Sequence, residues 1–82
     1  MDNRRRRLLY RATHCGMKEN DVLIGTFAKA VLADMDASVL GHFEALLEHS
    51  DNDLYNWITG REAAPQSARS DVLDMLIAFH AR

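Results

Sequence analysis

The feature of this sequence that most constrains its fold is an apolar stripe between Met17 and Met35. Side chains recur there at intervals of three and four residues, as they do along one face of an α-helix. The stripe consists of Met17, Asn20, Leu23, Ile24, Phe27, Ala28, Val31, Leu32 and Met35. Because such a stripe has to be covered by other apolar surface, it predicts a central core helix with further helices packed around it.

Gly25 lies inside this stripe. A glycine in a helix interior is less favourable than alanine by about 1 kcal/mol. It therefore indicates either a close approach of a second helix or a break in the helix near this point. The pattern leaves the end of this helix open between these alternatives.

A second helix is predicted before the stripe, from Asn3 to Cys15. Its apolar positions are again spaced by three and four residues, at Leu8, Leu9, Ala12 and Cys15. Gly16 follows at a place where a helix can end in a left-handed cap. The polar face of this helix is dominated by arginine.

Three further helices are predicted after the stripe, and no alternating pattern of β-branched residues indicates a strand. One is capped by Asp36 and buries Val39, Leu40, Phe43, Leu46 and Leu47. A short one starts at Asp51 or Asp53, ends at Gly60, and carries Leu54, Tyr55, Trp57 and Ile58. The last follows a loop over residues 61–66, is capped by Ser67, and faces the core with Val72, Leu73, Met75, Leu76, Ile77 and Phe79.

The expected fold is therefore all-α, a compact five-helix antiparallel bundle that forms a single domain over residues 1–82. A chain of 82 residues buries only about 60–65% of the surface that its unfolded form exposes, which is enough for one core. A protein of this size has little material left for a deep substrate cavity. This favours a module that acts on a partner over an enzyme.

The charge is distributed unevenly along the chain. The formal net charge is −2, which does not suggest a nucleic-acid-binding protein. However, five arginines stand within the first eleven residues, at positions 4, 5, 6, 7 and 11. The first helix could set them against phosphates, so a nucleic-acid-binding module stays open as an alternative, as does a generic protein-interaction module.

The cysteine content and the lack of a long apolar segment indicate the cellular compartment. The single cysteine, Cys15, rules out an internal disulfide and is typical of a reducing compartment. No apolar run approaches the roughly 18–20 residues that span a bilayer, and no signal-peptide core follows the arginines. We expect a bacterial cytoplasmic protein without membrane contact. The mitochondrial matrix is the alternative, but cleavage of an arginine-rich presequence would remove the first helix.

Catalytic and metal chemistry find little support in the sequence. His14 and Cys15 are the one pair that resembles a base and a nucleophile, but adjacent side chains on a helix do not face each other. His42, His49 and His80 lack the paired spacing of structural zinc ligands. The expectation is a protein that is not an enzyme and holds no metal.

The junction between the first two helices combines a glycine with several charges. Gly16 permits a close turn, and Glu19 falls in the first turn of the next helix. Its carboxylate is favoured there by exposed backbone amides and by the helix dipole. Glu19 is thus explained either by this local electrostatic effect or by a contact with a partner.

Several sequence pieces together resemble a known family. They are Arg7-Leu-Leu-Tyr, Gly16-Met-Lys-Glu-Asn-Asp, Asp53-Leu-Tyr-Asn-Trp and the apolar last helix. Over nearly its whole length the chain resembles the succinate dehydrogenase FAD assembly factors, small five-helix proteins of bacteria and mitochondria. The hallmark of that family is an Arg-Gly-x-x-Glu motif at the first helix junction. Gly16 and Glu19 match it, whereas Cys15 stands in the position of the arginine.

The resemblance implies an assembly factor that binds the flavoprotein subunit of succinate dehydrogenase and promotes covalent attachment of FAD to it. Fumarate reductase is a possible second target. FAD would belong to the partner, so the resemblance implies no cofactor bound by this chain itself, and we expect a monomer when the chain is free. The expected partner-binding residues surround the junction: Arg11, His14, Cys15, Gly16, Met17, Lys18, Glu19 and Asp21.

Overall fold

The computed structural model describes residues 1–81, which form five α-helices and two short 3-10 helices. The α-helices are α1 (Asn3–Thr13), α2 (Lys18–Val31), α3 (Ala37–Leu46), α4 (Asp51–Ile58) and α5 (Asp71–His80). The 3-10 helices are η1 (Leu32–Asp34) and η2 (Gln66–Ala68). No strand occurs within residues 1–81, so the expected all-α fold with five helices is confirmed.

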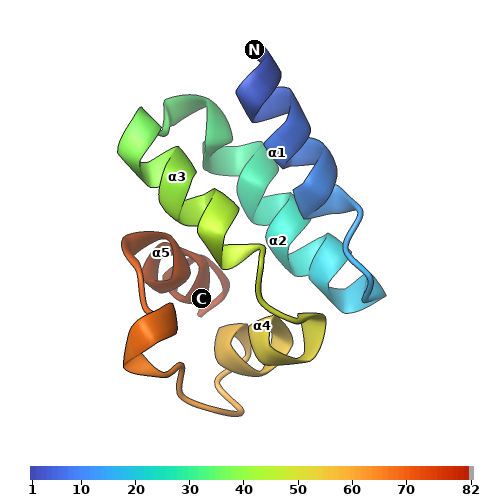
Figure 1. The fold of residues 1–82 in the computed structure, drawn as a ribbon. Helices are drawn as coiled ribbons and strands as arrows, with labels where there is room; N and C mark the ends of the chain where they lie inside the picture. The colour runs from blue at the N-terminus through green and yellow to red at the C-terminus, as the bar shows by residue number, and fades with distance from the viewer. Residues whose placement is uncertain (82) are drawn as a thin grey trace.

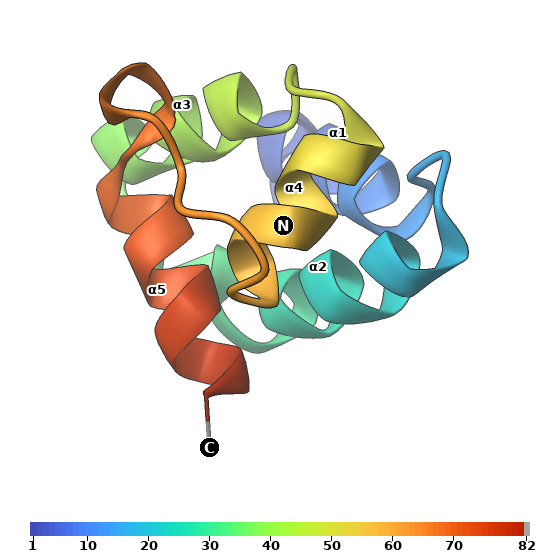
Figure 2. The same ribbon diagram turned by 90° about the horizontal axis from the view of Figure 1, so that it is seen from below.

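The helices surround one common core. In Figure 1, α1 and α2 run antiparallel side by side, and α3 crosses above the level of α4 and α5. Figure 2 shows from below how α5 closes the gap between α3 and α2, while α4 covers the centre. The molecule measures 34 × 25 × 25 Å, which is a single compact globule.

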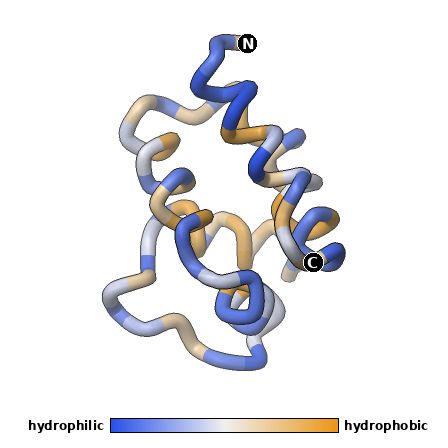
Figure 3. Tube along the Cα trace, turned by 45° about the vertical axis from the view of Figure 1, so that its right-hand side comes forward, coloured by the Kyte–Doolittle hydropathy of each residue, from blue (hydrophilic) through white to orange (hydrophobic). Residues whose placement is uncertain are grey.

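The core is centred on Phe27 of α2. Its ring meets the edges of Phe43 and Phe79, with ring centroids 5.8 and 5.6 Å apart. This places α2 at the centre of the bundle, as the apolar stripe predicts. Figure 3 shows that hydrophobic and hydrophilic residues alternate along the helices and that the beginning of α1, where the arginines lie, is hydrophilic. The buried apolar residues are Leu8, Ala12, Ile24, Phe27, Ala28, Leu32, Met35, Leu40, Phe43, Leu46, Leu54, Trp57, Ile58, Ala68, Val72, Leu73 and Leu76.

Gly25 is buried inside an unbroken stretch of α2. A Cβ atom at this position would lie 3.1 Å from Thr13 Cγ2 and 3.5 Å from the carbonyl oxygen of Ala12. The glycine therefore allows the end of α1 to approach α2 closely. Of the two predicted explanations, close approach is confirmed and a helix break is wrong; α2 ends later, at Val31, and continues into η1.

Several predicted helix ends are confirmed and others are wrong. Asp36 caps α3 by accepting a hydrogen bond from the Val39 N–H, and Gly60 follows α4 with a φ of +78°. Ser67 does not cap α5, because Pro65 directs residues 66–68 into η2. Ser70 caps α5 instead, and Ser50 caps α4.

The predicted inner face of the last helix is partly wrong. Val72, Leu73 and Leu76 are buried, but Met75 and Ile77 are 39% and 36% exposed. The buried positions lie on one side of α5, and Met75 and Ile77 project to either side of it. An apolar run on both sides of a helix does not by itself reveal which side the neighbouring helices cover.

Candidate functional site

The junction between α1 and α2 lies on the surface. We call residues 14–19 the elbow. α1 ends at Thr13, two residues earlier than predicted, and α2 begins at Lys18. Gly16, Lys18 and Glu19 are exposed, as is His14, whereas Cys15 and Met17 are half-buried. The residues that carry the family motif are therefore accessible to another molecule.

Gly16 leaves room for a neighbouring carboxylate and does not adopt the left-handed backbone conformation that favours glycine. Within residues 1–81 the one glycine with positive φ is Gly60, so the predicted left-handed cap at Gly16 is wrong. A Cβ atom on Gly16 would lie 2.5 Å from Oδ2 of Asp51, a distance that no real Cβ contact shows. The elbow passes so close to the start of α4 that any side chain on Gly16 would displace the Asp51 carboxylate.

Two side chains at the start of α2 hold the elbow in place. Asn20 is fully buried, and its Nδ2 donates to the backbone oxygen of Asp51 at 3.0 Å and to Oδ1 of Asp51 at 3.3 Å. Asp21 accepts a hydrogen bond from the backbone N–H of Cys15. The first bond joins the elbow to α4, and the second closes the turn before α2. Buried hydrogen bonds of this kind restrict a surface turn to one shape.

Asp21 is one of the predicted contact residues, and its carboxylate is engaged within the chain. Asn20 was predicted as a member of the apolar stripe, and its burial agrees with that position. Its role as a link to α4 was not predicted. No local pattern indicates it, since Asp51 lies 31 residues away.

Cys15 carries a thiol that stays protonated. Its Sγ lies 3.5 Å from the carbonyl oxygens of Arg11 and Ala12. Burial, reinforced by the negative charges of Asp21 and Asp51, raises the pKa of the thiol to about 11. Since the thiolate is the reactive form, Cys15 is a poor nucleophile at neutral pH.

The imidazole ring of His14 packs against Tyr10. The two rings stack with centroids 3.9 Å apart, and His14 Nδ1 lies 2.8 Å from the backbone oxygen of Tyr10. Tyr10 itself is 64% exposed. The pair forms a flat aromatic surface just before the elbow and gives His14 no hydrogen bond with Cys15.

An apolar groove adjoins Glu19. Its walls are formed by Glu19, Val22, Leu23, Tyr55 and Thr59, and its volume is about 370 Å³. Val22 is 61% exposed, although it is a large aliphatic residue. The sequence did not single out Val22 as a contact residue, because Val22 lies outside the apolar stripe. Its position about one helical turn after Glu19 could have indicated that the two side chains are neighbours.

Most arginines near the start of the chain are paired with carboxylates. Arg4 makes two hydrogen bonds to Glu44, at 2.7 and 3.1 Å. Arg5 pairs with Asp2, and Arg11, one of the predicted contact residues, pairs with Glu48, each at 2.5 Å. These pairs reduce the positive field that a phosphate backbone would meet, which argues against the nucleic-acid alternative.

Residues 1–81 present neither a cluster of metal ligands nor a helix that could span a membrane. In this part of the chain no three His, Cys, Asp or Glu side chains are grouped so that they could hold a metal ion. Over the same residues, none of the helices has the length and apolar character needed to cross a bilayer.

The fold and the elbow together define a class of protein. This is a small helical bundle whose distinctive residues lie on an open surface, in a turn whose shape is held by buried hydrogen bonds. Such an arrangement suits a protein that acts by binding another protein, because rigid turns lose little entropy on association.

Comparison with known proteins identifies the family. Residues 6–80 match the family described as flavinator of succinate dehydrogenase. The chain belongs to this family, which confirms the resemblance predicted from the elbow and helix motifs.

Individual relatives come from bacteria and from eukaryotes. The FAD assembly factor SdhE of Acetobacter pasteurianus is 39% identical over 74 residues, covering 90% of this chain and 68% of the relative. The mitochondrial succinate dehydrogenase assembly factor 2 of Danio rerio is 37% identical over 81 residues, covering 96% of this chain and 51% of the relative. The corresponding protein of Dictyostelium discoideum is 35% identical over 72 residues, with 88% and 51% covered. This chain thus spans about half the length of the mitochondrial relatives.

Proposed function

We propose that this protein binds the flavoprotein subunit of succinate dehydrogenase and promotes covalent attachment of FAD to that subunit. The observation that carries the proposal is the exposure of Gly16 and Glu19 on an elbow held by Asn20 and Asp21. Family membership supports the choice of partner, and the name of the Acetobacter relative refers to FAD assembly. The flavoprotein of fumarate reductase is a second target in this proposal.

The proposed contact surface consists of the elbow, Arg11, Asp21 and the groove beside Glu19. Glu19 carries no ion pair within residues 1–81, so its carboxylate is free to meet a positively charged group of the partner. Val22 and Tyr55 supply apolar area next to it. His14 and Lys18, which precede and follow Gly16 in the sequence, add exposed aromatic and positively charged groups to the elbow. A centre of apolar contact with charges around it is the usual composition of a protein interface.

In this proposal the protein is not an enzyme and binds no cofactor of its own. The bond between FAD and the flavoprotein forms inside the flavoprotein, where the flavin is held. This chain acts through binding energy, by favouring a conformation of the flavoprotein in which the reacting groups are aligned. The protonated state of Cys15 and the open shape of the groove beside Glu19 support a role in positioning.

Cys15 stands where the family resemblance implies an arginine. The carboxylates of Asp21 and Asp51, which disfavour a thiolate there, would attract a guanidinium group. An arginine at this position also offers a planar, permanently charged group for bidentate contacts, which a thiol does not. We therefore expect Cys15→Arg to be tolerated by the fold and to increase flavin attachment.

The test combines the purified chain with apo flavoprotein subunit and FAD and measures flavin fluorescence that survives denaturation. Cys15→Arg should raise the signal, and Glu19→Ala should lower it with unchanged helical content. Asp34→Ala is the matched control, because Asp34 is an exposed acidic residue in η1, beyond the other end of α2. If the wild-type and Cys15→Arg proteins both fail to bind the subunit and to raise covalent flavin, the proposal is wrong.

The proposal includes a monomeric state for the free protein. Of the exposed large apolar residues, Val22 lies on α2, and Met75 and Ile77 project to either side of α5. Single residues of this kind are normal on monomer surfaces. Sedimentation of the free chain at several concentrations tests this. A concentration-dependent shift to the mass of a dimer would contradict it.

The proposed location is the bacterial cytoplasm, with the mitochondrial matrix as the alternative. The bacterial relative and the mitochondrial relatives match similar shares of this chain, 90% and 96% in the two cases given above. Fractionation of the source cells followed by immunodetection decides between these compartments.

A further inference from the structure

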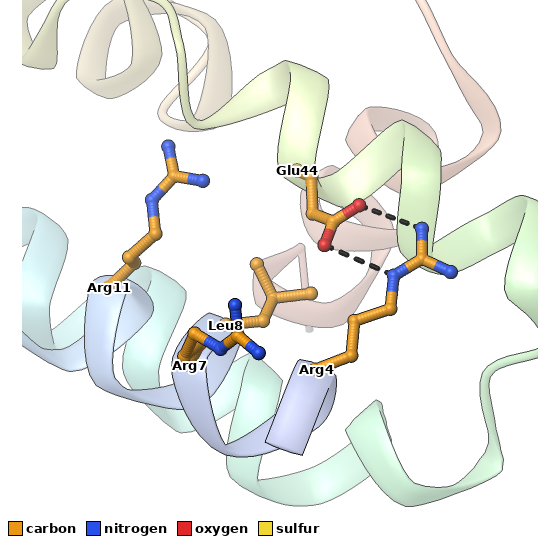
Figure 4. A pocket seen from close by; sticks show the side chains of 5 residues that line it. All are labelled: Arg4, Arg7, Leu8, Arg11 and Glu44. Carbon is orange, nitrogen blue, oxygen red and sulfur yellow. Dashed lines mark hydrogen bonds and ion pairs between the residues drawn. The ribbon is translucent and has the colours of Figure 1, made fainter. Parts of the chain in front are cut away.

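A second feature of α1 lies upstream of the elbow, where α1 faces α3. Arg4, Arg7, Leu8, Arg11 and Glu44 line a hollow of about 230 Å³. Figure 4 shows Arg4 and Arg11 at its two ends, with Arg7 and Leu8 between them. We call this feature the arginine hollow. The one apolar residue of its lining is Leu8, which is only 1% exposed.

The charges of the arginine hollow are unbalanced. Three arginines against Glu44 give a lining charge of 3 − 1 = +2, and counting Glu48, the partner of Arg11, leaves +1. Arg4 and Arg11 are held by Glu44 and Glu48, as described above. Arg7 pairs with no carboxylate within residues 1–81. It is therefore the guanidinium that remains available for a ligand.

The positive charge of Arg7 acts on the carboxylate of Glu44, which lines the same hollow. The pKa of Glu44 is lowered chiefly by its hydrogen bond with Arg4, and the positive charges of Arg11 and Arg7 lower it further. A carboxylate placed between Arg7 and Arg11 would experience the same attraction. A guanidinium group can bind a carboxylate through two parallel hydrogen bonds.

We propose that the arginine hollow receives an acidic side chain from the flavoprotein partner and so forms a second contact beside the elbow. This inference rests on the proposed function. The two surfaces are adjacent, because Cys15 Sγ lies 3.5 Å from the backbone oxygen of Arg11, which belongs to the hollow. One partner can therefore reach both. The ligand is an aspartate or glutamate in an acidic segment of that partner.

A nucleic acid fits the same hollow less well. Its phosphates follow one another at short intervals, so that neighbours of the one bound at Arg7 would approach Glu44 and Glu48. A single carboxylate side chain can bind at Arg7 without bringing further negative charges close to Glu44 and Glu48. The glutamates thus favour a protein ligand over a polyanionic strand.

The test uses the full-length chain and the apo flavoprotein subunit, with affinity measured at low and high salt. Arg7→Glu should weaken binding about ten-fold at low salt, and the difference should shrink in high salt, because rim charges act through screened attraction. Arg6→Glu is the matched control, since Arg6 is exposed on the same helix but does not line the hollow. It changes the net charge equally and should alter affinity less than about two-fold. Equal losses in both variants, or no loss in Arg7→Glu, overturn the inference.

A second measurement separates this inference from the proposed function. A glutamate-rich peptide is titrated into the wild-type chain while the arginine Nε–H signals are followed by NMR. Larger shifts for Arg7 and Arg11 than for Arg6 support the hollow even if the flavoprotein does not bind, in which case only the proposed function fails. Equal shifts for all arginines overturn it. Preferential binding of duplex DNA that is lost in Arg7→Glu also overturns it, in favour of a nucleic-acid ligand.

Discussion

The side-chain amide of Asn20 donates two hydrogen bonds to Asp51. One goes to the backbone oxygen of Asp51 at 3.0 Å, and the other goes to its carboxylate at 3.3 Å. Asn20 lies in the first turn of α2, and Asp51 begins α4, so this contact joins the elbow to a helix that is distant in sequence. It also holds the Asp51 carboxylate beside Gly16. The shape of the proposed contact surface thus depends on a polar pair formed by the buried Asn20 and the half-buried Asp51.

Two substitutions of Asn20 should show how side-chain shape and side-chain charge at this position each affect the stability of the protein. Oδ1 of Asn20 has no hydrogen-bond partner within residues 1–81, so the amide is only half satisfied. Asn20→Leu should destabilise the protein by about 1–2 kcal/mol, since the lost bonds are partly offset by apolar burial. Asn20→Asp should cost more, about 3–5 kcal/mol at neutral pH, because it buries a carboxylate against Asp51.

Urea unfolding at neutral and acidic pH measures both variants. A buried carboxylate has a raised pKa, so Asn20→Asp should regain stability as the pH falls and its side chain becomes neutral. Asn20→Leu carries no such group and serves as the comparison. A greater loss for Asn20→Leu than for Asn20→Asp at neutral pH would contradict the expected repulsion between a carboxylate at position 20 and Asp51.

Gly16→Ala should destabilise the protein by about 1–2 kcal/mol, because the new Cβ displaces the Asp51 carboxylate. Asp51→Ala removes that obstacle, so the double variant should lose about 1 kcal/mol less than the sum of the two single variants. Gly41→Ala is the control: its Cβ would meet Arg4 Nη2 at an ordinary 3.6 Å. It should be neutral or stabilising by about 0.5–1 kcal/mol. Strict additivity of Gly16→Ala and Asp51→Ala would refute the proposed clash.

Gly25→Ala should change stability by less than about 1 kcal/mol, since the gain in helix propensity opposes a tight contact with Thr13 Cγ2. Thr13→Ser removes that methyl group and keeps a hydroxyl for the hydrogen bond to the Leu9 oxygen. In the Thr13→Ser background, Gly25→Ala should therefore be stabilising by up to about 1 kcal/mol. Thermal unfolding of the four proteins checks this; the same effect in both backgrounds would contradict the close contact.

Cys15 should react slowly with a thiol-alkylating reagent. With a pKa of about 11 in place of the usual 9.0, its thiolate is about 100-fold rarer near pH 8. The rate should rise through about pH 11 and should match that of an ordinary thiol once the protein is unfolded in denaturant. Because the folded pKa is raised, the stability linked to the neutral thiol is present below about pH 9 and is lost as the pH rises through about 11. A fast reaction near pH 8 in the folded protein would contradict the burial of the thiol.

Helix formation and family membership followed from local information in the sequence. The spacing of Ile24, Phe27 and Ala28 predicted the buried face of α2, and Asp36 predicted the start of α3, because both depend on residues within a few positions of each other. The motif residues Gly16 and Glu19 were identified in the same way, and both lie exposed. Local patterns failed at Met75 and Ile77, where apolar character extends beyond the covered face.

The sequence by itself determined that this chain is a helical bundle with a glycine-containing junction. Only the tertiary structure decided why that glycine is there, since Asp51 comes to Gly16 from 35 positions further along the chain (51 − 16). The same holds for the pairing of Arg4 with Glu44 of α3 and of Arg11 with Glu48 just after α3, which leaves Arg7 without a carboxylate partner within residues 1–81. Helix spacing repeats every few residues and can be read locally, whereas contacts between helices depend on how all of them pack around Phe27.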